Sequence, residues 1–324
     1  LVRLTHSDDA VRWASVRALA QVANVNDHAT VSAVVQLLAH TEEGVRWAAI
    51  RALAQVAQKG DKHTIAAVAQ MLEHGDSNVR RLATHALAQV VEKGDGLAVE
   101  EIASRLEHAD DSVRLTATRA LTQIFGISDS QVIGAVAARL AHADEHVRHA
   151  AARAFEHVAT RDDEQMVSAV VAKLAHSNED VKRAAISTLA RVSSKGNQAA
   201  IAAVTMHLEH KDDRVKWAAV HGLAQVAEPG DKDALAATIG RLPHPDEAVR
   251  WAAVRALGQV AQRGDTSAID DVSAYLDHAE DGTREAASRA LVEVSTSCDA
   301  HALLSADRRL AHVDGGVRST GKSA

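Results

Sequence analysis

Among the residue types of this sequence, histidine has the number and spacing that most clearly suggest a chemical role. The chain has nineteen histidines among its 324 residues, and ten of them recur with a constant 34-residue period: His6, His40, His74, His108, His142, His176, His210, His244, His278 and His312. Zinc would need imidazole nitrogens about 2.0–2.1 Å from one ion, whereas equivalent residues in stacked helices lie roughly 10 Å apart. One such column therefore cannot form a shared metal site. We predict instead that each of these histidines lies at the end of a helix and hydrogen-bonds to late helix carbonyls or to the acidic residue two positions later.

A denser group of histidines lies in the middle of the chain and comprises His142, His146, His149 and His157, with Asp144 and Glu156 nearby. Two of them, His146 and His149, are three residues apart, which would bring them together on one side of a helix. A metal site is one interpretation of this group. We favour a polar helix face, because the spacing defines no compact set of four ligands. The sequence thus predicts neither a metal site nor a cofactor.

Residues 316–323 read Gly-Val-Arg-Ser-Thr-Gly-Lys-Ser and satisfy the P-loop pattern. A P-loop needs a preceding strand and a following helix whose N-terminus holds the phosphates. Here one residue follows and the segment continues a repeat, so we interpret the match as coincidence. Cys298 is the only thiol and can form no intrachain disulfide. Because no catalytic constellation is present, we predict that the protein is not an enzyme.

The histidine column belongs to a longer repeated pattern. A Leu lies two residues before each column histidine, an Asp, Glu or Asn lies two residues after it, and a Val followed by Arg or Lys begins five residues after nearly all of them. This 34-residue period holds for ten copies without an insertion, so we predict one solenoid over residues 1–324, with nine full repeats and partial repeats at both ends. The partial repeats lead us to expect a longer protein, or a partner that covers the ends.

Each repeat is predicted to fold as two helices, here called A and B. The apolar positions after Val45 follow helical spacing, and Gly60 can end this helix B with a left-handed residue. Asp61 can then cap the next helix A, whose apolar positions start at Ile65, and Asp76 can cap the helix B after it. Neither helix can bury its apolar side alone, so neighbouring pairs must stack. The predicted fold is an all-α, right-handed solenoid of antiparallel helix pairs.

The repeat unit resembles a known family. Residues 242–260 read Leu-Pro-His-Pro-Asp-Glu-Ala-Val-Arg-Trp-Ala-Ala-Val-Arg-Ala-Leu-Gly-Gln-Val, which is similar to the short HEAT-like repeats of the phycobilisome-lyase-like type. The tetratricopeptide repeat has the same length, but its Trp-x-x-Leu-Gly-x-x-Tyr pattern does not occur here. The resemblance implies an α-solenoid whose B helices line the concave side. It leaves function open, because this family includes scaffolds, adaptors, lyases and hydroxylases. The His-Glu dyads of the hydroxylase are absent, since no histidine here is followed by Glu.

Composition narrows the class of partner. The formal net charge is −7 and aromatic residues make up 2% of the chain, which disfavours nucleic acid as a partner. No run of 18 apolar residues occurs, so we expect no insertion into a membrane. The first residues lack signal or transit character. Together with the single cysteine, these features lead us to expect a soluble intracellular protein of the cytoplasm or an organelle interior.

The candidate binding residues lie on one side of helix B. Arginine recurs six residues after the column valines, and tryptophan or arginine recurs two residues after them, so the two columns share a helix face. Tryptophan and arginine are the residues that most often anchor protein interfaces. We therefore predict a protein-binding surface made of Trp13, Arg17, Trp47, Arg51, Arg81, Arg119, Arg153, Arg183, Trp217, Trp251 and Arg255.

The preferred function is a non-enzymatic scaffold, or a subunit of a larger assembly, that presents helix B to a protein with an acidic or mixed surface. An anionic polymer, either nucleic acid or a phosphorylated tail, could instead bind along the arginine column. An auxiliary subunit or bilin-lyase-like factor of a light-harvesting assembly is a third alternative, which depends on the resemblance alone. The tryptophans also have a purely local interpretation, in which the Arg four residues later stacks over each ring.

Overall fold

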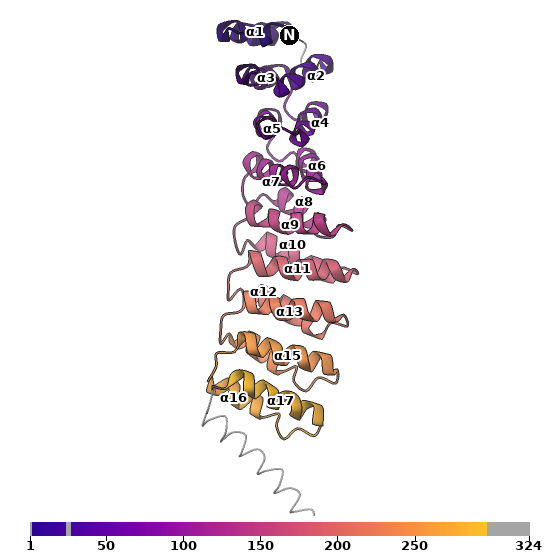
Figure 1. The fold of residues 1–324 in the computed structure, drawn as a ribbon, viewed down its shortest axis with the longest axis vertical. Helices are drawn as coiled ribbons and strands as arrows, with labels where there is room; N and C mark the ends of the chain where they lie inside the picture. The colour runs from indigo at the N-terminus through magenta and orange to yellow at the C-terminus, as the bar shows by residue number, and fades with distance from the viewer. Residues whose placement is uncertain (1, 24–26, 297–324) are drawn as a thin grey trace, which may run out of the picture. The chain divides into compact units, whose positions relative to one another are not determined.

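The computed structural model describes residues 2–23 and 27–296, and all regular secondary structure in these ranges is helical (Figure 1). The chain divides into two compact units, Leu1–Met166 and Val167–Ala324, and each is described by itself. Helix pairs with the 34-residue period fill the described part of both units, which confirms the predicted all-α solenoid. The P-loop-like segment at residues 316–323, Cys298 and His312 lie outside the described residues.

Helix B is the longer member of each pair. The B helices are α1 (Asp9–Val22), α3 (Glu43–Val56), α5 (Ser77–Val90), α7 (Asp111–Phe125), α9 (Glu145–Val158), α11 (Glu179–Val192), α13 (Asp213–Val226), α15 (Glu247–Val260) and α17 (Asp281–Val294). The A helices are α2 (His28–Gln36), α4 (Lys62–Gln70), α6 (Gly96–Ala103), α8 (Ser130–Arg139), α10 (Glu164–Val171), α12 (Gln198–Thr205), α14 (Lys232–Ile239) and α16 (Thr266–Ser273). Short 3-10 helices lie before helix B in many repeats: η1 (Val2–Thr5), η2 (Leu37–Ala39), η3 (Met71–Glu73), η4 (Ser104–Glu107), η5 (Ala172–Ala175) and η6 (Met206–Glu209). None of the helices in the described ranges is both long and apolar enough to cross a lipid bilayer.

Acidic side chains cap most of the described helices, and the two predicted caps, Asp61 and Asp76, are confirmed. At the start of α4, the Asp61 carboxylate accepts a hydrogen bond from the backbone N–H of Thr64 at 2.9 Å. At the start of α5, Asp76 accepts a bond from the N–H of Asn78 at 2.8 Å. Each cap satisfies a backbone donor that the first turn of a helix leaves unpaired, and such a cap contributes about 1 kcal/mol to stability.

Within each unit the helices form two layers. B helices pack against B helices, from α1 to α9 in the first unit and from α11 to α17 in the second, while A helices pack against A helices. The core between the layers consists mainly of Ala, Val, Leu and Ile, and the leucine before each described column histidine is buried, from Leu4 to Leu276. Helix α1 differs, because Ala18, Leu19 and Val22 are partly or largely exposed, whereas α3 buries the equivalent Ala52, Leu53 and Val56. The reason is that α1 packs mainly against η1 and α3 among the described elements.

The turn from helix B to helix A forms a backbone hydrogen bond with the next repeat. Helix α3 ends at Val56, and Ala57 after it is extended, so the prediction that Gly60 ends this helix B is wrong. Gly60 lies in the turn that follows, with a φ of 77°, a left-handed value that L side chains rarely adopt, and its N–H donates to the carbonyl of Val90 at 2.8 Å. The same backbone bond joins four further pairs: Ser128 to Val158, Gly196 to Val226, Gly230 to Val260 and Gly264 to Val294. Each bond satisfies a carbonyl at the end of a helix B, which has no partner within its own helix.

Candidate protein-binding face of the B helices

The histidine column forms a repeated hydrogen bond in the turn before helix B. In all nine described copies, the Nδ1 atom of the column histidine accepts a bond from the backbone N–H two residues later, with N···N distances of 3.0–3.2 Å. The donor belongs to the residue that precedes helix B and occupies its N-cap position. The predicted bond to a late carbonyl is therefore wrong, whereas the predicted partner two positions later is confirmed, with its backbone amide as the donor. Since Nδ1 accepts this bond, the neutral ring carries its proton on Nε2.

Two of the central histidines lie near carboxylates, His142 in the turn before α9 and His149 on α9. His142 lies 3.9 Å from Glu107, and His149 lies 3.8 Å from Glu145. The described residues contain no group of three or more His, Cys, Asp and Glu side chains placed to hold a metal ion.

The arginine that follows the column valine points back into the same turn. Arg46, Arg80 and Arg148 each donate from Nη1 to the carbonyl of the column histidine and to the next carbonyl, at 2.7–3.0 Å. An ion pair with an acidic residue near the turn accompanies these bonds in some repeats, for example between Arg114 and Asp111 at 2.9 Å. These guanidinium groups are thus used within the fold, where they satisfy carbonyls of the turn.

Each tryptophan of helix B is covered by a side chain from the next repeat. The Cζ atoms of three arginines lie 4.0–4.2 Å from the ring centroids that they cover, in the pairs Arg51–Trp13, Arg255–Trp217 and Arg289–Trp251. Trp47 instead contacts His85, with ring centroids 5.7 Å apart. In all four pairs the covering residue lies one full repeat plus four positions after the tryptophan. The local interpretation is therefore wrong about the arginine, because each stacked arginine comes from the adjacent B helix. At Trp217 a ring four residues later on the same helix also stacks, that of His221, with ring centroids 6.0 Å apart.

Stacking leaves the indole rings accessible. The exposed fraction is 44% for Trp13, 42% for Trp217 and 38% for Trp251, whereas Trp47 is half-buried. The Nε1 atom of Trp47 also donates to Glu43 at 3.4 Å. Three of the four tryptophans thus combine a fixed contact inside the fold with a ring surface that another molecule can reach.

Two of the predicted arginines form ion pairs with carboxylates, although the sequence shows no obvious partner for the arginine column. Arg153 pairs with Asp111 of the preceding helix pair, and this hydrogen bond is the main reason why the pKa of Asp111 is lowered from its usual value. Arg183 pairs with Asp180 at 3.3 Å. The guanidinium groups of three predicted arginines form no hydrogen bond, ion pair or ring contact within the described residues: Arg17, Arg81 and Arg119.

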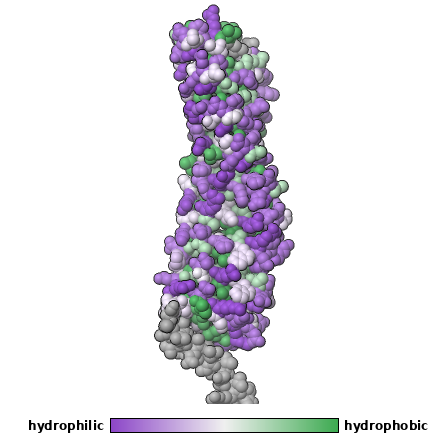
Figure 2. Space-filling model, viewed as in Figure 1, coloured by the Kyte–Doolittle hydropathy of each residue, from purple (hydrophilic) through white to green (hydrophobic). Residues whose placement is uncertain are grey.

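Surface grooves occur on the B helices of both units. The N-terminal groove lies between α1 and α3, has a volume of about 430 Å³, and is lined by Trp13, Val16, Arg17, Ala20, Gln21, Arg51, Ala54 and Gln55. Its charged side chains are all cationic. On the face drawn in Figure 2, hydrophilic residues cover most of the surface and hydrophobic residues form small patches between them. An apolar groove is therefore a local feature of a largely polar surface.

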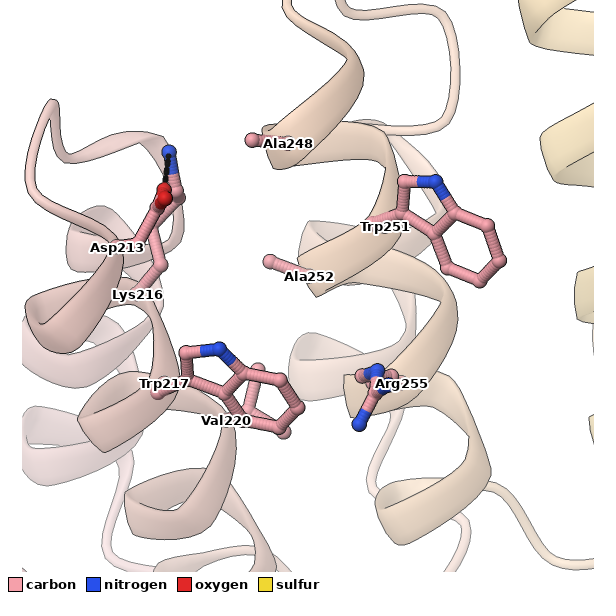
Figure 3. A pocket seen from close by; sticks show the side chains of 8 residues that line it. All are labelled: Asp213, Lys216, Trp217, Val220, Ala248, Trp251, Ala252 and Arg255. Atoms are coloured by element: carbon pink, nitrogen blue, oxygen red, sulfur yellow. Dashed lines mark ion pairs between the residues drawn. The ribbon is translucent and has the colours of Figure 1, made fainter.

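The C-terminal groove repeats this arrangement six repeats later, on α13, α15 and α17. Its volume is about 480 Å³, and it is lined by Trp217, Val220, His221, Trp251, Val254, Arg255, Gly258, Gln259, Arg289, Val292 and Glu293. A cavity of about 310 Å³ adjoins it between α13 and α15. Ala248 and Ala252 border this cavity from α15 with single methyl groups (Figure 3). On the α13 side Lys216 is turned toward Asp213, with which it forms an ion pair at 2.8 Å.

The grooves bring together six of the eleven predicted binding residues: Trp13, Arg17 and Arg51 in the first unit, and Trp217, Trp251 and Arg255 in the second. The other five do not line these grooves: Trp47, Arg81, Arg119, Arg153 and Arg183. Arg289 lines the C-terminal groove although it is not among the predicted residues. Its place in the arginine column, one repeat plus four residues after Trp251, is the sequence signal that identifies it.

Comparison with known proteins places the repeat in a family. A family model described as HEAT repeats matches residues 1–88, 167–241 and 236–318, which is more than half of the chain. An engineered protein of known structure is 22% identical over 96% of this chain and 97% of its own, with a TM-score of 0.34. Human deoxyhypusine hydroxylase in complex with glycerol is 18% identical over 82% of this chain and 96% of its own, with a TM-score of 0.32. A structure of microtubule polymerases with TOG domain arrays, solved to explain tubulin recruitment, is 11% identical over 90% and 92%, with a TM-score of 0.30.

No curated protein matches the sequence. The three TM-scores are below 0.5, so the assignment depends on the family model and on the helix pairs described above. The matches do not distinguish the phycobilisome-lyase-like subtype. With its family match over residues 1–88, 167–241 and 236–318, and with antiparallel helix pairs at a constant 34-residue period, the chain belongs to the family of HEAT-repeat proteins.

Proposed function

We propose that this protein is a non-enzymatic scaffold that binds other proteins through the exposed side of its B helices. HEAT repeats generally serve as scaffolds for protein interactions, which supports the class of function. The observation that carries the proposal is that a groove lined by tryptophan and arginine occurs at equivalent repeat positions of both units. In the N-terminal groove the lining pair is Trp13 and Arg51, and in the C-terminal groove it is Trp217 and Arg255.

The tryptophans have the properties of interface anchors. An exposed indole ring keeps apolar surface in contact with water, which is unfavourable. A partner that covers the ring removes this surface from water, and the gain in free energy favours binding. Stacking under Arg51 or Arg255 also restricts the ring before a partner arrives, so less side-chain entropy is lost on binding. Large, rigid and partly exposed aromatic residues beside arginine are the typical composition of energetically dominant contacts.

The charges favour a protein partner with an acidic or mixed surface over an anionic polymer. A polyanion gains affinity from many unpaired cations in a row. Along the arginine column, Arg153 and Arg289 are already paired with Asp111 and Glu285. Arginines without a carboxylate partner also lie in the grooves next to apolar side chains, namely Arg17, Arg51 and Arg255, and this combination suits a protein surface better than a uniform chain of phosphates.

Site-specific crosslinking in cells tests this proposal. A photoreactive amino acid is placed at Gln21 or Gln259, at the edges of the two grooves, and at the exposed control positions Lys62 or Lys232 on A helices. We expect proteins that crosslink at the groove positions and not at the controls, and that are lost when Trp13 and Trp217 are both changed to Ala. The same set of proteins at groove and control positions would contradict the proposal, and crosslinked nucleic acid would favour the anionic polymer.

A further inference from the structure

We propose that each groove binds an acidic–apolar peptide segment of a partner protein. In this complex a carboxylate of the segment pairs with the tryptophan-stacked arginine, Arg51 or Arg255, and a neighbouring aliphatic side chain enters the space beside it. The inference rests on the proposed function and specifies the chemistry of the partner.

The stacked arginines have hydrogen-bonding capacity that the fold does not use. Arg51 lies over Trp13 and Arg255 lies over Trp217, with Cζ-to-centroid distances of 4.0 and 4.2 Å. Neither guanidinium forms a hydrogen bond or ion pair within the described residues. The ring contact uses the face of the guanidinium, so the five N–H groups in its plane stay available. A carboxylate can accept two parallel bonds from this edge, and the stacking already fixes its orientation.

Arg289 shows within this same chain how such a carboxylate binds. Its Cζ atom lies 4.1 Å from the ring centroid of Trp251, and its Nη2 atom lies 2.6 Å from the Glu285 carboxylate. Glu285 is four residues before Arg289 on helix α17. One guanidinium therefore covers an indole ring and binds a carboxylate at the same time.

The equivalent internal carboxylate is missing at the two grooves. Tryptophan occupies the position four residues before the stacked arginine, Trp47 before Arg51 and Trp251 before Arg255. The place that Glu285 fills beside Arg289 is thus left for a carboxylate from another molecule. This is why the occupant must contain an acidic residue.

The surroundings of the stacked arginines require an apolar group next to that carboxylate. Val16, Ala20 and Ala54 line the N-terminal groove. Val220, Ala248 and Ala252 line the cavity beside Arg255, whose volume of about 310 Å³ exceeds the roughly 150 Å³ that holds a benzene ring. An aliphatic side chain fits such a space and loses its contact with water there.

Local charge supports the same occupant. The whole chain has a formal net charge of −7, yet the N-terminal groove contains Arg17 and Arg51 with no acidic lining residue. In the cavity beside Arg255, the charges of Lys216 and Asp213 cancel. The acidic lining residue of the C-terminal groove is Glu293, which lies on α17. We therefore expect the N-terminal groove to bind the segment more tightly.

The test uses three fluorescein-labelled peptides of equal length with Gly-Ser flanks. Their central residues are Leu-Glu-Leu-Glu, Leu-Lys-Leu-Lys or Ser-Glu-Ser-Glu, and binding to the full chain is followed by fluorescence anisotropy. We expect the Leu-Glu peptide to bind at least about tenfold more tightly than either other peptide, a difference of about 1.4 kcal/mol. The double variant Arg51→Gln/Arg255→Gln should lose at least about tenfold in affinity for this peptide. The matched control Arg161→Gln/Arg263→Gln removes two exposed arginines, one in each unit, from turns that follow B helices and should bind as the wild type does.

Each other outcome overturns the inference in a recognisable way. Equal binding of the Ser-Glu peptide would mean that the grooves bind any anion. Equal binding of the Leu-Lys peptide, lost in Trp13→Ala/Trp217→Ala, would leave the proposed function standing and remove the role of the carboxylate. Equal losses in the arginine pair and its control would indicate unspecific electrostatics. If no peptide binds at millimolar concentration, the inference is wrong, and the crosslinking experiment decides the proposed function separately.

Discussion

Arg255 lies over the indole ring of Trp217, with its Cζ atom 4.2 Å from the ring centroid, although the two residues belong to adjacent repeats. The contact joins α15 to α13, and it uses one part of a residue of which 42% stays exposed. Packing and binding are therefore compatible roles for the same side chain. Variants of the arginine can separate them, because they change the stacking without removing the indole.

Arg255→Ala should uncover Trp217 without unfolding the repeat. In a background where the other three tryptophans are changed to Phe, we expect a red-shifted emission and stronger quenching by acrylamide. A cation–π contact at an exposed site contributes about 0.5–1 kcal/mol, so the unfolding midpoint should fall only slightly. Arg119→Ala is the control, because Arg119 covers no tryptophan; an equal spectral change in this variant would contradict the prediction.

Gly134 and Gly222 are both helical glycines, yet alanine should have opposite effects at the two positions. A Cβ atom on Gly134 meets no atom within 4 Å, so Gly134→Ala should stabilise α8 by about 1 kcal/mol through helix propensity. A Cβ atom on Gly222 would lie 2.8 Å from Cγ2 of Ile186 and 3.1 Å from Cγ1 of Val204. Overpacking of this kind costs about 1–3 kcal/mol and exceeds the propensity gain. Chemical denaturation of both variants checks the signs; two stabilised variants would contradict the packing at Gly222.

His176→Ala should lower stability, whereas His176→Asn should largely preserve it. The Nδ1 atom of His176 accepts a bond from the N–H of Asn178 at 3.1 Å. The Asn carbonyl oxygen can occupy the place of Nδ1, while Ala leaves the amide without this acceptor at a cost of about 1 kcal/mol. Thermal melts of the two variants make the comparison. Stoichiometric zinc or iron in the wild type that is lost in His176→Ala would show that the column binds metal.

Arg139 on α8 forms ion pairs with residues of α6 and η4, and its removal should lower the stability of the first unit. Its side chain is buried, pairing with Glu100 at 2.6 Å and with Glu107 at 3.1 Å. Arg139→Met keeps much of the apolar stem and loses both ion pairs. Because the two carboxylates remain accessible to water, we expect a loss of about 1–2 kcal/mol, at the lower end for charged hydrogen bonds. An unchanged denaturation midpoint would show that the ion pairs contribute no net stability.

Because of His210, the stability of the protein should fall as the pH is lowered. Burial is the main reason why the pKa of His210 is lowered from its usual value, and Lys182, whose Nζ atom lies 2.9 Å from Nε2, acts in the same direction. Glu179, at 3.1 Å, opposes them. The contribution of the neutral ring is therefore fully present above about pH 6.5 and is lost as the pH falls through the lowered pKa. We expect His210→Asn, which cannot be protonated there, to show a smaller fall of melting temperature between about pH 7 and pH 5; an equal fall would contradict this.

The repeat, the helix pairs and the N-terminal caps can be predicted from the sequence because they depend on neighbours in the chain. The predicted end of helix B is wrong, because α3 ends at Val56 and Gly60 bonds to Val90 of the next repeat instead of capping α3. The Asp61 and Asp76 caps follow from residue type and from helical periodicity alone. The partner of a tryptophan does not, because it depends on the offset between stacked helices. Helical spacing favours Arg17 as the cover of Trp13, whereas stacking places Arg51 there.

The grooves cannot be predicted from the sequence either, because they too depend on how adjacent helices stack. Ala248 and Ala252 match the small residues expected of a tightly packed helix, and only the structure places them beside Trp217 with space between them. The arginine column likewise gives no sign that Asp111 reaches Arg153, since the two residues belong to different repeats. Contacts between repeats thus decide which of the repeated side chains are available to a partner.

The backbone hydrogen bond from Gly230 to the carbonyl of Val260 has a consequence for how the protein can gain or lose repeats in evolution. Donor and acceptor are main-chain groups in adjacent repeats, and the donor position requires only a residue that tolerates a left-handed backbone, as Ser128 does with a φ of 63°. Duplication of one whole repeat would bring one new donor and one new acceptor in the correct register. Unequal recombination within the coding sequence could therefore add or delete whole repeats while the remaining donors and acceptors of this bond stay in register.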